Sequence, residues 1–563
     1  MLLHQVIEFA AGTSPDVDAL VFGDRRWTFA ELENDVARMG TTLAHAVARD
    51  ERIAWFSDNC PELAMALYAV PRAGALLVLG NVRHTPAEQV AMLISSSASV
   101  VVGSAEQLSR LAPHADELRE VRRWYCLDGV DEPGGVDEPG DIENPTAGGT
   151  ALPPGTRDAA ELFERDPEPP RSGLDDDTHV WLIHTSGTTG RAKGALLTHR
   201  SVVAASTNTA LARPIADDDV YLFPFPLFHI AAYNLVVHHL GRRPVVLLPR
   251  FDADRVLAAI RDERVTTVSL APTMLAMLLE HPERSVEDLS TLRRIGYGAS
   301  AMPLDLLRRT LAELPEVGLA QGYGMTELSG NAVFLGPEEH RRAGADEPWL
   351  LGAAGRPAPL VQIRIADDDG ADVAAGEPGE VLVRGDQVCA GYWDDPGATV
   401  ESHHGEWFRT GDIGRIDEHG YLHIIDRKKD IIISGGENVS SREVEDIVSE
   451  HPDVAAVAVI GLPDDTWGER VCAVVVWNGD RGTHAPHGRA RELVDWTDGR
   501  MAGFKRPRVV VSVPELPTNA SGKVDKRTIR HHLVPTPALP DDTALPNDRD
   551  VPDDRNVPDD TGQ

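Results

Sequence analysis

The chain has 563 residues and a formal net charge of −35, with 54 Lys and Arg against 89 Asp and Glu. Such an excess of negative charge disfavours binding to nucleic-acid phosphates or to anionic membrane surfaces, so neither class of partner is expected. Hydrophobic residues make up 42% and charged residues 25%, as in ordinary globular chains, and the length predicts three to four domains.

Negative charge is concentrated in residues 128–177 and 541–563. Both segments are also rich in Pro, Gly and Asp, which favours solvated irregular chain over acidic binding sites. Residues 534–563 repeat short Val-Pro and Asp-Asp patterns and are predicted to form a disordered acidic tail.

The cysteines and the apolar runs bear on the cellular compartment. Cys60, Cys126, Cys389 and Cys472 lie far apart and form no CxxC pair, so neither a zinc site nor a disulfide framework is expected. The first twenty residues lack the basic region of a signal peptide, and no apolar run has the roughly 20 residues of a membrane-spanning helix. A cytoplasmic protein without a membrane span is predicted.

Strand-like and helix-like segments alternate along most of the chain. A helix is predicted over residues 28–47, capped by Thr28, with apolar residues at helical spacing. Short apolar runs at 100–103 and 245–248 are typical of buried strands, and residues 256–279 read as helix, strand and helix. This alternation predicts layered α/β subdomains.

The pattern changes after about residue 360. Residues 361–370 and 379–385 alternate apolar with polar residues between Asp-Gly and Pro-Gly turns, which predicts antiparallel hairpins in a β-rich subdomain. Two further β segments, 421–425 and 430–433, are separated by the charged residues 426–429, where we expect the strand to be interrupted.

A second domain is predicted from this break onward. Ser440 is followed three residues later by Glu443, which predicts a helix start, and the apolar runs 454–460 and 471–477 predict strands. We therefore expect a large N-terminal domain over 1–428, a small mobile α+β domain over 429–533, and the tail over 534–563.

The segment after the predicted strand 180–183 has the composition of a phosphate cradle. Its glycines allow tight turns that aim N–H groups at an anion, its hydroxyls can donate to phosphate oxygens, and Lys193 adds positive charge. It is not a Walker A loop, because Ala192 stands where that motif needs Gly. A flexible polar linker is the alternative interpretation. The candidate phosphate-binding residues are Thr185, Ser186, Gly187, Thr188, Thr189, Gly190 and Lys193.

Further motifs follow in a fixed order: GYGMTE at 322–327, RTGD at 409–412, DRKKD at 426–430, SGGEN at 434–438 and PTNASGK at 517–523. Together with the glycine-rich loop they closely resemble those of the adenylate-forming superfamily, which includes acyl-CoA synthetases, luciferases and peptide-synthetase adenylation domains. The resemblance covers roughly residues 15 to 530.

The resemblance implies that a carboxylate attacks the α-phosphate of ATP, expels pyrophosphate and is then passed from AMP to a thiol. It implies ATP and CoA as co-substrates and Mg²⁺ as cofactor. Glu327 would hold Mg²⁺, Thr326 would grip phosphate, and Lys523 would bridge the carboxylate and the α-phosphate. These residue types suit a transition state that gathers negative charge on phosphate oxygens.

The same resemblance assigns the nucleotide pocket. Asp412 would bind the ribose hydroxyls with Arg427 as an accompanying donor, and Tyr323 would stack on adenine. The other implied lining residues are Gly298, Ala299, Ser300, Gly322, Gly324 and Met325. Taken singly, these residues have plain structural alternatives: Asp412 in a turn, Arg427 as a surface cation and Tyr323 in the core.

For the second half-reaction the resemblance implies rotation of the C-terminal domain about a hinge at Lys429. Gly435 and Gly436 would then line a tunnel for the pantetheine arm, where side chains would block its passage. Trp467 and the basic pair Lys505 and Arg506 are the implied contacts of the CoA nucleotide, a solvated basic turn being the alternative for the pair.

The acyl pocket is expected near residues 225–234. His229 matches the family histidine at the mouth of the pocket; the alternative is a buried, hydrogen-bonded core histidine. Fatty-acyl members often carry Trp four residues later, where this chain has Tyr233. The candidate lining is His229, Tyr233, Asn234, Tyr297, Gly298, Ser329, Gly330 and Asn331. No acid is present at 229–236 to pair with an ammonium group, which favours a fatty, aryl or alkyl carboxylate over an amino acid.

The sequence thus predicts an ATP- and Mg²⁺-dependent carboxylate:CoA ligase acting on a medium- or long-chain fatty acid or a related biosynthetic acid. One alternative is an adenylating ligase that delivers its acyl group to an amine, another nucleophile or the thiol of a carrier protein supplied in trans. A non-catalytic nucleotide-binding scaffold is disfavoured because Glu327, Asp412, Arg427 and Lys523 are all present. The sequence leaves the oligomeric state open.

Overall fold

The computed structural model describes residues 1–130, 151–185, 193–282, 284–285, 287–300, 302–464, 467–479, 487–519 and 523–533. The chain divides into two compact units, the first formed by residues 1–410 and 414–424 and the second by residues 411–413 and 425–563. The expected boundary after residue 428 stays a prediction. The expected tail at 534–563 and the loop residues Ser186 to Gly190 lie outside the described residues.

Two large sheets form the body of the first unit. One has the strand order β19-β9-β8-β4-β3-β5-β6-β7, parallel from β8 to β7 and antiparallel at β9 and β19. Its strands are β3 (Arg52–Phe56), β4 (Leu76–Leu79), β5 (Ala98–Gly103), β6 (Arg123–Cys126), β7 (Arg157–Asp158), β8 (His179–Thr185), β9 (Lys193–Thr198) and β19 (Gly391–Tyr392).

The other large sheet has the order β16-β15-β14-β13-β12-β10-β11-β1-β2 and is parallel from β14 to β1. Its strands are β1 (Asp18–Phe22), β2 (Arg25–Thr28), β10 (Tyr221–Phe223), β11 (Val245–Leu247), β12 (Thr267–Leu270), β13 (Arg294–Gly298), β14 (Gly318–Met325), β15 (Gly330–Leu335) and β16 (Arg356–Pro357). The strands expected at 245–248 and 265–270 are thus confirmed with slightly shorter bounds.

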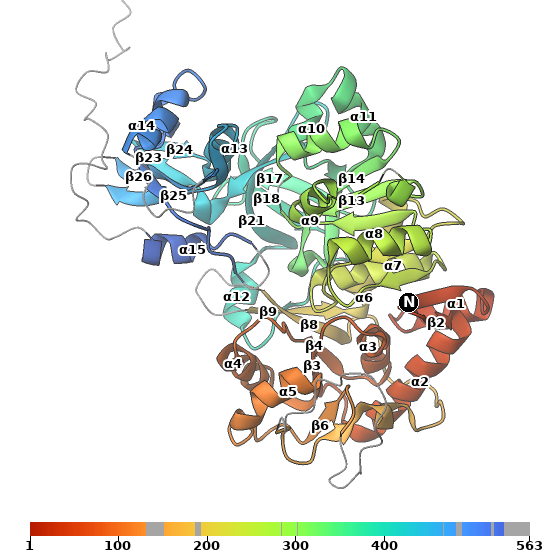
Figure 1. Cartoon of the computed structure of the whole chain (residues 1–563). Helices are drawn as coiled ribbons and strands as arrows, with labels where there is room; N and C mark the ends of the chain where they lie inside the picture. The colour runs from red at the N-terminus through yellow and green to blue at the C-terminus, as the bar shows by residue number, and fades with distance from the viewer. Residues whose placement is uncertain are drawn as a thin grey trace, which may run out of the picture. The chain divides into compact units, whose positions relative to one another are not determined.

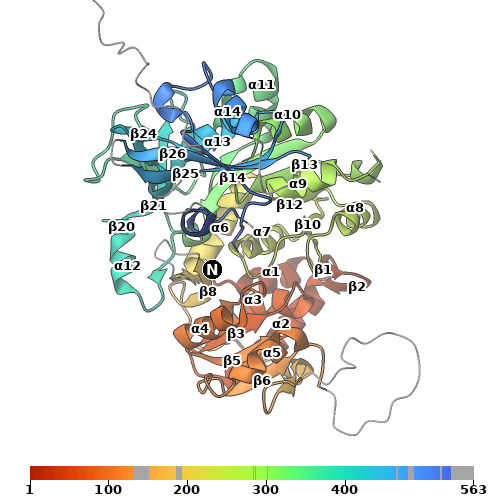
Figure 2. The same ribbon diagram turned by 60° about the vertical axis from the view of Figure 1, so that its left-hand side comes forward.

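Helices cover both faces of these sheets (Figures 1 and 2). They are α1 (Gln5–Thr13), α2 (Phe29–Ala46), α3 (Pro61–Arg72), α4 (Pro86–Ser96), α5 (Ala105–Leu111), α6 (His199–Ala212), α7 (Tyr233–Leu240), α8 (Ala253–Asp262), α9 (Pro272–Leu279), α10 (Leu304–Glu313), α11 (Pro337–Ala345) and α12 (Pro396–Glu401). The predicted cap of α2 is confirmed: Thr28 and Glu31 form a reciprocal capping box.

Alternation along the strands explains the layers. On β3, Trp55 belongs to one hydrophobic cluster and the next residue, Phe56, to another on the opposite face. On β10, Tyr221 joins the same cluster as Trp55, whereas Leu222 packs with helices α8 to α10. One core, which includes residues of α2, α3, α6 and α7, is therefore shared by the inner faces of both sheets.

The expected β-rich part is also confirmed. It is a sheet ordered β17-β18-β21-β20, with β22 paired to β21, and β17 and β18 form the antiparallel pair expected from their alternation. Its strands are β17 (Gln362–Ala366), β18 (Gly379–Arg384), β20 (His403–His404), β21 (Trp407–Ile416) and β22 (Leu422–Arg427).

The second unit is α+β, as expected. Its sheet has the order β24-β23-β26-β25, with β27 paired in parallel to β26. Its elements are β23 (Ile432–Ser434), β24 (Glu437–Val439), α13 (Ser441–Ser449), β25 (Val454–Asp464), β26 (Gly468–Trp477), α14 (His487–Trp496), β27 (Val509–Ser512) and α15 (Lys526–Thr528). Ser440 caps α13 by accepting from the Glu443 amide, as predicted.

One detail of this region was predicted wrongly. The charged residues Asp426 and Arg427 do not interrupt a strand but form the end of β22. Asp426 is buried, and its carboxylate accepts hydrogen bonds from the hydroxyls of Ser440 and Ser441 and from the Arg442 amide. Because these donors replace water, a charged side chain is tolerated inside the strand. The strand ends at the short 3-10 turn Lys428–Asp430.

No helix in the described ranges is both long and apolar enough to cross a membrane.

A buried carboxylate fixes the end of the large sheet where β13 begins. Asp219 accepts hydrogen bonds from the Ala216 amide at 2.7 Å and from the Thr266 hydroxyl at 2.9 Å, and it forms ion pairs with Arg293 and Arg294. Its side chain is 1% exposed, so these donors take the place of water. The network sets the start of β13, whose other end reaches the candidate site.

Asp219→Ala should therefore lower the free energy of unfolding by about 3 kcal/mol, because it leaves buried donors unpaired. The matched control is Asp218→Ala, which removes a carboxylate that also pairs with Arg293 but whose side chain is 75% exposed. Thermal and urea unfolding of the two variants measures the difference. Equal losses of stability would show that the Asp219 network is no more important than a surface pair.

Candidate active site

The ends of β13 and β14 bring together two of the predicted nucleotide-binding segments. The strands are parallel, and Gly298 is paired in register with Gly322. A Cβ atom at Gly298 would lie 2.5 Å from the Gly322 carbonyl oxygen, so only glycine permits this approach. The chain then leaves β13 through Ala299, whose φ of 68° is unusual for a residue with a side chain. Ser300 follows, exposed at the same edge.

Glu327 lies in the tight turn between β14 and β15, directly after Thr326. Its side chain accepts a hydrogen bond from the Tyr392 hydroxyl at 3.0 Å and from the Thr185 hydroxyl at 3.5 Å. Its backbone carbonyl accepts from the Cys389 amide at 2.8 Å. Residues from β8 and β19 thus meet at the Glu327 carboxylate, and the segment before β19 holds its backbone.

The environment of Glu327 changes the proton affinity of its neighbours. Burial, reinforced by the negative charge of Glu327, raises the pKa of the Tyr392 hydroxyl far above its usual value. The same two causes raise the pKa of the Cys389 thiol to about 12. Both groups therefore stay protonated at neutral pH, and Tyr392 remains a donor to the carboxylate.

The two ends of the predicted phosphate loop lie at this carboxylate. Thr185 and Lys193 are partners in the antiparallel pair of β8 and β9, and the Thr185 hydroxyl donates to the Lys193 carbonyl at 3.3 Å. The Lys193 ammonium lies 5.1 Å from the centre of the Tyr392 ring. The residues between them, 186–192, are outside the described ranges.

This donor set fits Mg²⁺. Mg²⁺ prefers oxygen ligands, keeps several waters, and is usually held by one or two carboxylates together with substrate phosphates. Glu327, flanked by the hydroxyls of Thr185 and Tyr392, meets that description. In the described ranges, no three His, Cys, Asp or Glu residues gather as a cage that could bind a metal by protein ligands alone.

Tyr323 is half-buried on β14, at a bulge before Gly324. It packs against the hydrophobic cluster of the β-rich sheet, as does Met325. Both residues are on the strand that leads into the Glu327 turn, so they lie at the edge where Gly298 and Gly322 meet.

On the acyl side, Tyr233 and Gly330 are in contact. A Cβ at Gly330 would lie 2.8 Å from the Tyr233 ring, and its φ of 146° is also a conformation that favours glycine. The Tyr233 hydroxyl accepts from Thr209 at 3.3 Å. Next to this contact, Asn234 Oδ1 and Ser329 Oγ are buried and have no hydrogen-bond partner among the described residues.

The remaining acyl-pocket candidates are more scattered. Tyr297 lies in the hydrophobic core with helices α8 to α10, and its hydroxyl is hydrogen-bonded to His340 at 2.7 Å, so it is not grouped with Tyr233. The Asn331 side chain lies against Gly322. His229 is half-buried beside Phe228, with ring centres 4.7 Å apart.

Within the second unit, the predicted pair Asp412 and Arg427 is in direct contact. Arg427 Nε lies 2.7 Å from Asp412 Oδ1. The Asp412 side chain is 3% exposed, whereas that of Arg427 is 46% exposed. The buried Asp412 carboxylate is therefore oriented by a cation.

Gly435 and Gly436 form the two-residue turn between β23 and β24. Their φ values are 63° and 85°, which is the left-handed geometry that such hairpins need. A Cβ at Gly435 would lie 2.8 Å from the Trp467 ring, but one at Gly436 would meet nothing within 4 Å. The structure thus places the predicted Gly435, Gly436 and Trp467 together.

The predicted basic residues of this unit already have acidic partners. Lys505 is paired with Glu443 at 2.7 Å and Arg506 with Asp498 at 2.8 Å.

Lys429 lies in the 3-10 turn after β22, and its hinge role stays a prediction. Lys523 is exposed beside Asn519, whose side chain accepts from its amide.

Sequence reasoning missed Tyr392 and Cys389, which contact Glu327 directly. They lie more than sixty positions beyond it, and no spacing rule links them to the motif at 322–327. A tyrosine preceded by glycine at the start of a short strand is a common pattern, so only the fold reveals its role.

Comparison with known proteins agrees with this geometry. The family described as AMP-binding enzyme matches residues 7–393, and the AMP-binding enzyme C-terminal domain matches residues 443–523. The indoleacetate–CoA ligase of Aromatoleum aromaticum is 36% identical over 94% of this chain and 98% of its own length. A feruloyl-CoA synthase from an Amycolatopsis species is 37% identical over 92% and 96%.

Among solved structures, the o-succinylbenzoate CoA synthetase of Bacillus subtilis in complex with ATP and magnesium has a TM-score of 0.77 and 30% identity. The match covers 94% of this chain and 98% of that one.

The close approach of β13 and β14 can be tested directly. Gly298→Ala should push the two strand ends apart and weaken AMP binding by about tenfold or more, which corresponds to roughly 1.4 kcal/mol. Isothermal titration calorimetry measures the dissociation constant. Gly352→Ala is the control, because a Cβ there would meet nothing within 4 Å. Unchanged affinity in Gly298→Ala would separate this strand edge from the nucleotide site.

Proposed function

This chain belongs to the AMP-binding enzyme family, and from that premise we propose that it is an ATP-dependent carboxylate:CoA ligase working through an acyl-AMP intermediate. The observation that carries the proposal is that Thr185 and Tyr392 both donate to Glu327 where β14 ends, with the Lys193 ammonium near the Tyr392 ring. The CoA-ligase relatives that cover nearly the whole chain support the acceptor.

In the first half-reaction a carboxylate oxygen bonds to the α-phosphorus of ATP while the bond to pyrophosphate breaks. Mg²⁺, when bound at Glu327, would offset phosphate charge. Thr185, Thr326 and Lys193 would donate to phosphate oxygens, and the fixed donors would favour the charge that develops during displacement. Gly298 and Gly322 would let the purine approach the backbone, with Tyr323 against its face.

Asp412 would accept hydrogen bonds from the ribose hydroxyls. Its ion pair with Arg427 supports this role, because the cation holds the carboxylate in a fixed orientation. Lys523 would neutralise the carboxylate and α-phosphate oxygens as they meet.

In the second half-reaction the thiol of CoA attacks the acyl carbon, and AMP leaves. Rotation about Lys429 would bring the Gly435–Gly436 turn to the pantetheine arm. The open space above Gly436 supports a passage there. Lys505 and Arg506 would contact CoA phosphates only in competition with Glu443 and Asp498, so their contribution should fall with rising salt.

For the substrate we propose an aryl-substituted acid with a hydrogen-bond donor, in preference to a plain fatty acid. Asn234 Oδ1 and Ser329 Oγ are buried next to the Tyr233–Gly330 contact without a partner in the described part of the chain. A substrate N–H or O–H would satisfy such an acceptor, whereas an alkyl chain would leave it unpaired. Two relatives are named for indoleacetate and feruloyl substrates.

The reducing cytoplasm is the proposed location. All four cysteines, Cys60, Cys126, Cys389 and Cys472, are free in the structure.

The test is pyrophosphate release with a panel of acids, with and without CoA. We expect release with indole-3-acetate and ferulate, CoA consumption in equal amount, and a kcat/KM about tenfold or more above those of octanoate and palmitate. The matched substrate is 1-methylindole-3-acetate, in which a methyl group replaces the hydrogen of the N–H donor.

Each other outcome assigns a different function. Release without CoA consumption would favour delivery to an amine or to the thiol of a carrier protein. Preference for palmitate would contradict the substrate class but not the reaction. No release with any acid would leave a nucleotide-binding scaffold.

We also predict that different residues serve the two half-reactions. Lys523→Ala should abolish acyl-AMP formation but leave thioester formation from supplied acyl-AMP largely intact. Gly436→Phe should do the reverse, because the bulky ring occupies the space above the turn. Rapid-quench measurement of each half-reaction provides the readout, and each variant is the control for the other. Equal loss of both half-reactions in either variant would contradict a two-orientation mechanism.

A further inference from the structure

Two buried side-chain amides connect helix α6 to the turn that carries Glu327. Asn208 on α6 donates from Nδ2 to Gln387 Oε1 at 2.7 Å. Gln387 Nε2 in turn donates to the Leu328 carbonyl at 2.9 Å and to the Asn331 carbonyl at 3.1 Å. Both side chains belong to residues that are 1% exposed.

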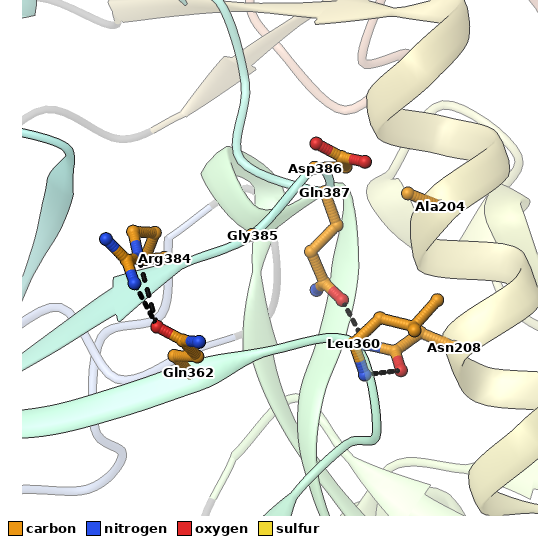
Figure 3. Close-up of a pocket in the computed structure, with 8 residues that line it drawn as sticks. All are labelled: Ala204, Asn208, Leu360, Gln362, Arg384, Gly385, Asp386 and Gln387. Carbon is orange, nitrogen blue, oxygen red and sulfur yellow. Dashed lines mark hydrogen bonds between the residues drawn. The ribbon is translucent and has the colours of Figure 1, made fainter.

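The direction of this chain of hydrogen bonds is fixed at both ends. At one end the Leu360 amide donates to Asn208 Oδ1 at 3.0 Å, so the other side of the Asn208 amide must be the donor (Figure 3). At the opposite end two carbonyl oxygens require donors from Gln387. Asparagine and glutamine are the side chains that supply an acceptor and a donor in this arrangement, and an apolar substitute satisfies neither.

The turn that receives these bonds is one that needs external support. Ser329 has a left-handed φ of 52°, and Gly330 follows with a φ of 146°. The segment around Gln387 donates hydrogen bonds to three backbone carbonyls of the turn. Besides those of Leu328 and Asn331, the Glu327 carbonyl accepts from the Cys389 amide at 2.8 Å. The position of the Glu327 carboxylate therefore depends on these contacts.

Helix α6 reaches the same turn by a second route. Thr209, the residue after Asn208, donates to the Tyr233 hydroxyl, and the Tyr233 ring packs against Gly330. One helix thus contacts both the metal side and the acyl side of the turn.

On the side that faces a cavity, side-chain packing does not hold the two amides in place. A cavity of about 300 Å³ adjoins them, lined also by Gln362, Arg384 and Asp386 (Figure 3). Hydrogen bonds, and not packing, therefore hold the Gln387 side chain on the side that faces the cavity.

We infer that Asn208 and Gln387 are positioning residues that hold the 326–331 turn so that Glu327 is preset to bind Mg²⁺ with ATP. The inference rests on the proposed function. Neither residue touches the reacting atoms; both act through the backbone of the turn.

Gln387→Met and Asn208→Leu remove the amides with little change in shape. Both variants should raise the Mg²⁺ concentration for half-maximal pyrophosphate release by about tenfold, with a smaller effect on kcat at saturating Mg²⁺. The control is Gln362→Met, a matched change at an exposed residue lining the same cavity, where the Gln362 side chain accepts from Arg384. This control should keep the wild-type Mg²⁺ dependence.

A second readout needs no turnover. In the protein without nucleotide or metal, amide hydrogen exchange over residues 326–332 should be about tenfold faster in both variants, because the turn opens more often. Variants that unfold at a lower temperature but keep wild-type exchange and Mg²⁺ dependence would overturn the inference and leave a purely structural role. If the wild-type protein releases no pyrophosphate, the proposed function fails, and the exchange result still decides whether the amides hold the turn.

Discussion

Glu327 is held by two parts of the chain that are distant from it in sequence, Thr185 and the segment 389–392, and the candidate site is organised around these contacts. Tyr392 and Thr185 donate to its side chain, and Cys389 donates to its backbone. A carboxylate with preset donors loses little freedom when it meets a cation and phosphates. The same contact joins Thr185, which precedes the predicted phosphate loop, to the turn that follows β14.

The layered architecture explains how such distant residues meet. Glu327 follows β14 of one large sheet, whereas Thr185 and Tyr392 belong to β8 and β19 of the other. Helix α6 belongs to the core shared by both sheets and supports the turn through Asn208 and Thr209. Packing of the shared core is therefore also what brings the residues of the candidate site together.

In the second unit, the abundant acidic residues pair with basic side chains. Lys505, Arg506 and Lys526 all have carboxylate partners, Glu443, Asp498 and Glu445 respectively. An anionic ligand has to compete with these pairs, which weakens its binding and makes it sensitive to salt. The turn at Gly435 and Gly436 carries no such charge, and its role depends on backbone conformation and open space.

The sequence alone determined the family, the α/β class and the identity of the motif residues, because glycines, hydroxyls and single charges at set positions reflect local backbone geometry and local chemistry. Caps such as Thr28 and Ser440 were predictable for the same reason. The tertiary structure decided which groups surround those motifs. Tyr392 donates to Glu327 from the other large sheet, and Gln387 donates to the Leu328 carbonyl next to it. Asp426 is tolerated in a strand by donors from α13, and Tyr297 lies in the core hydrogen-bonded to His340. Contacts between residues far apart in the chain depend on how the layers pack, and spacing along the sequence does not encode them.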